Sequence, residues 1–160
     1  MTTLPITLTI AGAAALMNVW LGLRVSLLRR RLKVSVGDGG ESAITARMRA
    51  HANYIEYTPF FLILLALVEL AAGSDTWLWL VAIIFILGRL AHVFGMDREG
   101  ANLLRVSGIS ITWLCLLGLA AYAIVLSYEG RRQAAPVVGY AELDMRASTL
   151  SATKWLVRRS

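Results

Sequence analysis

The sequence predicts an all-α integral membrane protein with four transmembrane helices. Of its 160 residues, 58% are hydrophobic, which is well above the share in a soluble domain, and the mean hydropathy is +0.64. The apolar residues fall into four runs, and each can cross about 30 Å of hydrocarbon as a helix of roughly 20 residues. We therefore expect one four-helix domain over residues 1–129 and a more polar tail over residues 130–160.

Charge and cysteine content exclude several classes of protein. The net charge is +6, but in so apolar a chain Lys and Arg mark topology and contact anionic headgroups, so no nucleic-acid partner is expected. The single cysteine, Cys115, cannot form an internal disulfide. The two histidines, His51 and His92, lack a third ligand, so we predict no metal site.

The first two spans are predicted over residues 4–28 and 43–72. The first is followed by the basic run Arg29-Arg30-Arg31-Leu32-Lys33, which is typical of a cytoplasmic connection. The second exceeds the thickness of the hydrocarbon, so its basic first turns should extend beyond it. Pro59 is expected to kink this helix.

The last two spans are predicted over residues 76–96 and 102–128. Basic residues concentrate around the first connection, so the positive-inside rule places both loops in the cytoplasm and both termini outside. The tail adds basic residues on the predicted outer side. It also carries a helical stripe of Leu143, Ala147, Leu150 and Val157 with Trp155 nearby, which indicates either a surface helix or a docking segment.

Strongly polar residues gather near the predicted cytoplasmic ends of the spans. Arg49, Asn53 and Glu56 fall within roughly 60° of one another on one helix face. The other polar residues near these ends are Arg24, Arg89, His92 and Arg105. Together they could form a cationic cleft for a small anionic or zwitterionic ligand, because Arg pairs with carboxylates while Asn and Glu hold an amide and an ammonium. The alternative is that the arginines reach to headgroups and that Glu–Arg pairs only join helices.

The spacing Arg49-Ala50-His51-x-Asn53-x-x-Glu56-x-x-Pro59 resembles the second-helix signature of the MAPEG family, the membrane-associated proteins in eicosanoid and glutathione metabolism. Gly88-Arg89-x-x-His92, followed by Arg105, is similar to the third- and fourth-helix pattern of that family. The resemblance covers roughly residues 5–128. The segments 37–40 and 105–113 look most like its bacterial inner-membrane branch.

The resemblance implies a homotrimer of four-helix protomers in the bacterial inner membrane, with glutathione bound between neighbouring subunits. Arg105 would stabilise the glutathione thiolate. The tripeptide itself would be held by Arg49, Asn53, Glu56, Arg89 and His92, and by Arg24 through a less secure alignment. The function implied is a glutathione transferase or peroxidase that acts on a lipophilic electrophile from the bilayer.

Two positions depart from the pattern of some catalytic members, which have tyrosine where this chain has Met96 and Ile109. Either the thiolate relies on Arg105 alone or the chemistry has been lost or changed. Whether the chain is an enzyme therefore stays open. The competing interpretation is a non-catalytic accessory or structural subunit that docks a larger membrane complex through its tail. A small transporter is disfavoured because the sequence shows no inverted repeats.

Overall fold

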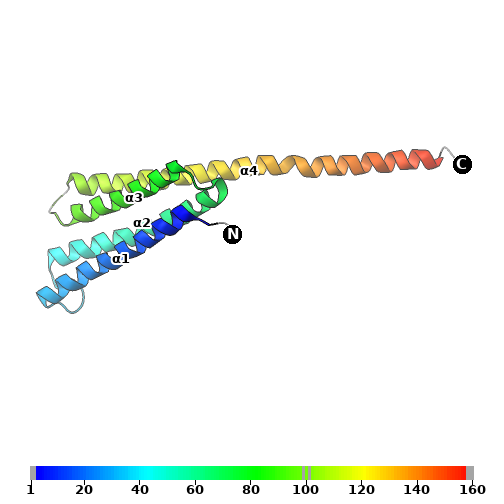
Figure 1. Ribbon diagram of the computed structural model, residues 1–160. Coiled ribbons are helices and arrows are strands. Elements are labelled where there is room, and N and C mark those ends of the chain that lie inside the picture. The colour runs from blue at the N-terminus through cyan, green and yellow to red at the C-terminus, as the bar shows by residue number, and fades with distance from the viewer. Residues whose placement is uncertain (1–2, 99, 101, 158–160) are drawn as a thin grey trace. The chain divides into compact units, whose positions relative to one another are not determined.

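The computed structural model is all-α and describes residues 3–98, 100 and 102–157, with side chains described as far as Gly130. Four helices follow one another in the chain: α1 (Pro5–Leu32), α2 (Ser42–Ala72), α3 (Thr76–Met96) and α4 (Leu103–Val157) (Figure 1). The first three helices, and Leu103–Gly130 of α4, are each long and apolar enough to cross a membrane. The predicted four-helix membrane fold is therefore confirmed.

Helix α1 extends beyond the predicted end of the first span. It begins at Pro5, where the missing N–H has no intrahelical partner to lose. It ends at Leu32, and Lys33 adopts a left-handed conformation with φ of 58° while its N–H bonds the carbonyls of Arg29 and Arg30. The basic run that was expected to follow the span is thus the last turn of the helix, where cations favour the helix dipole.

The chain divides into two parts, residues 1–123 and 124–160. The second part consists, as far as the structure describes it, of the continuation of α4 to Val157. Helix therefore extends through the segment predicted as a tail. The predicted stripe of Leu143, Ala147, Leu150, Val157 and Trp155 falls here, where the side chains lie outside what the structure describes.

Two apolar clusters form the core of the first part. In one, the rings of Phe61 and Phe85 stack with their centroids 3.6 Å apart, joining α2 to α3. Leu119 brings α4 into the same cluster. In the other cluster, buried Tyr54 packs with residues of α1 and α3 and donates a hydrogen bond to the Ala14 carbonyl at 2.8 Å. Together the two clusters join all four helices.

A buried carboxylate that is not predicted from the sequence fixes the first turn of α1. Glu69, near the end of α2, is 2% exposed. It accepts hydrogen bonds from the backbone N–H groups of Ile6 and Thr7 at 2.9 and 2.8 Å. The hydroxyls of Thr7 and Ser74 also donate to it, at 2.7 and 2.8 Å. A negative charge at a helix N-terminus satisfies orphan N–H groups and favours the dipole, so Glu69 joins α2 to the start of α1.

The connection between α1 and α2 is organised by Asp38. Its carboxylate accepts hydrogen bonds from the Gly40 N–H at 3.1 Å and from the Thr45 hydroxyl at 2.8 Å. These bonds, the one from Gly40 foremost, hold the pKa of the Asp38 carboxyl below its usual range. Asp38 therefore anchors the glycine-rich loop to the first turn of α2.

Candidate functional site

Four of the predicted site residues line one groove of about 430 Å³ between α2, α3 and α4. Its walls are Arg49 and Asn53 from α2, His92 and Met96 from α3, and Arg105, Val106 and Ile109 from α4. No carboxylate is among these lining residues, and the guanidinium-bearing Arg49 and Arg105 are both exposed. The groove therefore favours an anionic ligand.

Glycines bring α3 and α4 together beside this groove. A Cβ added at Gly108 would lie 2.5 Å from the His92 backbone nitrogen and 2.6 Å from the Gly88 carbonyl oxygen. A Cβ at Gly95 would collide with the backbone of Arg105. Small residues at such crossings let membrane helices approach closely. The close approach is what places His92 next to Arg105.

The contact between His92 and Arg105 runs through the backbone of Arg105. His92 is buried, and its Nδ1 lies 3.1 Å from the Arg105 carbonyl oxygen. The Arg105 N–H in turn donates to Asn102 Oδ1 at 3.1 Å, and Asn102 Nδ2 donates to the Gly95 carbonyl at 2.8 Å. The turn between α3 and α4 is thus closed by Asn102, and the Arg105 side chain is left to the groove.

Arg89 contributes to the site from behind the groove. It is 0% exposed, and its Nη2 donates to Asn53 Oδ1 at 2.8 Å while its Nη1 donates to the Thr112 hydroxyl at 3.2 Å. The rings of Tyr54 and Tyr57 lie 5.7 and 5.9 Å from its guanidinium carbon. Arg89 therefore reaches the groove only through Asn53, whose amide it orients.

Glu56 does not line the groove. It is exposed, and it makes no hydrogen bond or ion pair within the described part of the chain. It shares a helix face with Arg49 but lies seven residues further along, which is about 10 Å at helical rise. Glu56 is accordingly available to a ligand or to another protein chain.

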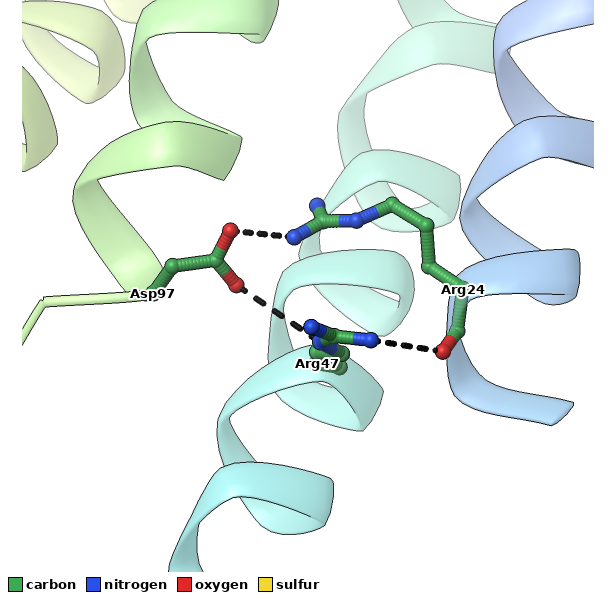
Figure 2. Close-up of polar contacts among 3 residues, drawn as sticks. All are labelled: Arg24, Arg47 and Asp97. Atoms are coloured by element: carbon green, nitrogen blue, oxygen red, sulfur yellow. Dashed lines mark hydrogen bonds and ion pairs between the residues drawn. The ribbon is translucent and has the colours of Figure 1, made fainter. Parts of the chain in front are cut away.

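Arg24 is also outside the groove, because it pairs with an acidic residue of the same chain. Figure 2 shows the Asp97 carboxylate between the guanidinium groups of Arg24 and Arg47. Arg47 Nε lies 3.9 Å from Asp97 Oδ1, and Arg47 Nη1 donates to the Arg24 carbonyl at 3.0 Å. This cluster ties α1 and α2 to the residue that follows α3.

Arg47, Asp97 and Asn102 lie in the site region but were not predicted as site residues. Asn102 offered a signal, since Asn is a preferred N-cap and comes directly before α4. Asp97 offered no signal beyond its charge, because its partners Arg24 and Arg47 come from two other helices. Met96 and Ile109, which were noted only as departures from a pattern, both line the groove.

Replacing Gly108 with Ala is expected to destabilise the protein by about 1–3 kcal/mol, because the new methyl group meets backbone atoms of α3 that cannot move aside cheaply. Thermal unfolding in detergent, followed by circular dichroism, measures the effect. The matched control is Gly118→Ala on the same helix, where nothing lies within 4 Å of the new Cβ. Equal melting temperatures for the two variants would contradict the close packing of α3 and α4 at Gly108.

Comparison with known proteins agrees with the four-helix membrane fold. A family model described as the MAPEG family matches residues 7–125. The inner membrane protein YecN of Escherichia coli (strain K12) is 34% identical over 108 residues, which cover 67% of this chain and 81% of that protein. The protein of the same name from Escherichia coli O6:H1 is similar to the same extent. The family match spans all four apolar runs and every residue of the groove, and the chain therefore belongs to the MAPEG family.

Proposed function

We propose that this protein binds glutathione in the groove and transfers its thiolate to a lipophilic electrophile from the bilayer, or uses that thiolate to reduce it. The observation that carries the proposal is the composition of the groove. It presents the guanidinium groups of Arg49 and Arg105, the amide of Asn53 and the imidazole of His92, without a lining carboxylate. Membership of the MAPEG family makes glutathione the ligand to test first.

The chemistry needs no protein nucleophile. A free thiol has a pKa of about 8.5 and is mostly protonated at pH 7, whereas a guanidinium beside it favours the thiolate. We assign this role to Arg105, whose side chain lines the groove while its N–H and carbonyl are hydrogen-bonded in and beside the turn. Arg49 and Asn53 would then hold the carboxylate and amide groups of the tripeptide.

The proposal includes a homotrimer in the bacterial inner membrane with both loops in the cytoplasm. In support, YecN is named as an inner membrane protein, and Glu56 is exposed on the helix face that carries the groove residues of α2. In such a trimer the ligand lies between two subunits. One subunit contributes Glu56, and the neighbouring subunit contributes its Arg24 to the same site.

A second candidate function is a non-catalytic subunit of a larger membrane complex. The observation that favours it is that Met96 and Ile109 both line the groove. Where a tyrosine hydroxyl could bond the ligand sulfur, these side chains offer a thioether and an alkyl group. Tyr54 does not replace these missing tyrosine hydroxyls, because its own hydroxyl already donates to the Ala14 carbonyl at 2.8 Å.

Calorimetry of the detergent-solubilised protein with glutathione and with S-hexylglutathione tests the proposed function. Binding of both ligands, with the hexyl compound tighter because of its apolar chain, is the expected result. Absence of binding for both would reject the glutathione proposal and favour the accessory subunit.

Glu56→Gln is expected to weaken the binding of glutathione by about 1.5–3 kcal/mol, because the carboxylate is proposed to hold the ligand ammonium in a charge-assisted hydrogen bond. The oligomeric state in detergent should not change. The two measurements are calorimetry and size-exclusion chromatography with light scattering. Dissociation of the oligomer with unchanged affinity would instead assign Glu56 to contacts between subunits.

Truncation after Glu129 should leave glutathione binding unchanged, since every proposed site residue precedes that point. If the tail docks a larger complex, the same truncation should release the protein from co-purifying partners. Mild-detergent purification of both forms, sized side by side, separates these outcomes. A full-length protein that runs as a bare trimer and is unaffected by truncation would contradict docking through the tail.

A further inference from the structure

The hydrogen bond of His92 fixes which ring nitrogen carries the proton. Nδ1 lies 3.1 Å from the carbonyl oxygen of Arg105. A backbone carbonyl can only accept, so Nδ1 must be the donor in this contact. In a neutral imidazole the other nitrogen, Nε2, then has a free lone pair. The backbone of α4 thus selects the tautomer of a side chain on α3.

The Nε2 atom of His92 is available to a ligand. It makes no hydrogen bond to any residue that the structure describes, and His92 lines the groove together with the Arg105 side chain. The ring is therefore held through one nitrogen, while its basic nitrogen is left free for the contents of the groove.

The other polar side chains of the groove act as donors. Arg49 and Arg105 have only donor groups. Asn53 has both kinds, but its Oδ1 accepts from Arg89 Nη2 at 2.8 Å, which leaves the Nδ2 hydrogens for a ligand. Among the lining residues, His92 Nε2 is consequently the one nitrogen able to take up a proton.

We propose that His92 Nε2 is the general base that accepts the thiol proton of the ligand, an assignment that rests on the proposed function. The S–H bond breaks, its proton moves to Nε2, and its electron pair stays on the sulfur beside the Arg105 guanidinium. The sulfur then adds to an electrophilic double bond of the substrate and forms an S–C bond. The electron pair displaced from that double bond takes the proton back from the imidazolium, so neutral His92 is restored.

The charges around His92 keep its ring neutral until a thiol ligand is bound. Arg49 faces it from α2 and Arg105 from α4, while Arg89 lies one turn before it on α3. No carboxylate lines the groove to hold an imidazolium in the absence of a ligand. The thiolate itself supplies the negative charge that balances the protonated ring, so proton transfer is coupled to the presence of a thiol ligand.

The proton count on binding tests the assignment in the unaltered protein. Glutathione is titrated at pH 7 in two buffers of different ionisation enthalpy, and the thiolate is measured by its ultraviolet absorbance. S-hexylglutathione, which has no thiol proton, is the reference ligand. We expect thiolate to form with almost no release of protons to the buffer, because His92 retains them. Release of one proton per thiolate formed would overturn the assignment.

His92→Asn provides the matched variant, since the Asn Nδ2 can still donate to the Arg105 carbonyl but offers no basic nitrogen. Turnover should fall by about 100-fold, as expected for a lost general base, and by much more than the affinity for S-hexylglutathione, which has no thiol proton to give up. Any thiolate formed should now release its proton to the buffer. Wild-type turnover in this variant would overturn the assignment of His92 as the general base. If the wild-type protein bound neither ligand, the proposed function would be overturned, and the assignment of His92 as general base would fall with it.

Discussion

Glu69→Gln should lower the free energy of unfolding by about 2–4 kcal/mol, the largest stability change expected for a conservative substitution in this protein. The carboxylate is 2% exposed and accepts four hydrogen bonds, two of them from the first N–H groups of α1. An amide keeps one accepting oxygen and adds two donors that face other donors. It also removes the charge that favours the N-terminus of α1.

Chemical unfolding in mixed micelles, followed by far-ultraviolet circular dichroism, measures this loss. Glu56→Gln is the matched control, because it makes the same change on the same helix at an exposed carboxylate. It should alter stability by less than about 0.5 kcal/mol. Equal effects of the two substitutions would show that Glu69 contributes no more than a surface carboxylate.

Arg105→Leu should reduce turnover of glutathione by about 100-fold or more while the fold is retained. A fixed donor aimed at a developing anion is typically worth this much. The fold should survive because Arg105 contributes its N–H and carbonyl to the structure, and both remain in leucine. The thiolate absorbance of bound glutathione should disappear together with turnover.

The control for Arg105 is Arg98→Leu, which removes an exposed guanidinium from the turn between α3 and α4 without altering the groove. It should leave both the thiolate signal and turnover unchanged. If Arg105→Leu kept a wild-type thiolate signal, the sulfur would have to be stabilised by another group, and the role given to Arg105 would be wrong.

The sequence predicted the four membrane helices because their long apolar runs match the hydropathy that a span needs. The predicted boundaries 43–72 and 76–96 differ from α2 and α3 by at most one residue. Helices α1 and α4 continue beyond the predicted ends of their spans. Arginine is a good helix former, so the backbone of α1 continues as helix to Leu32 although the apolar run stops before it.

The candidate site was predictable only in part. Helical spacing placed Arg49 and Asn53 on one face, and both line the groove. The same spacing included Glu56, because angle around a helix says nothing about distance along it. The pairing of Arg24 with Asp97 depends on how α1 packs against the end of α3. The bond from His92 to a backbone carbonyl depends on a glycine contact between two helices.

The position of Glu69 bears on how the protein enters its membrane. Helix α1 is synthesised before α2, yet the N–H groups of Ile6 and Thr7 find their partner only on Glu69, more than sixty residues later. Until α2 lies beside α1 in the membrane, the leading turn of α1 must be solvated by water or headgroups. The first two helices are therefore expected to insert as a pair, with the arrival of Glu69 completing the hairpin.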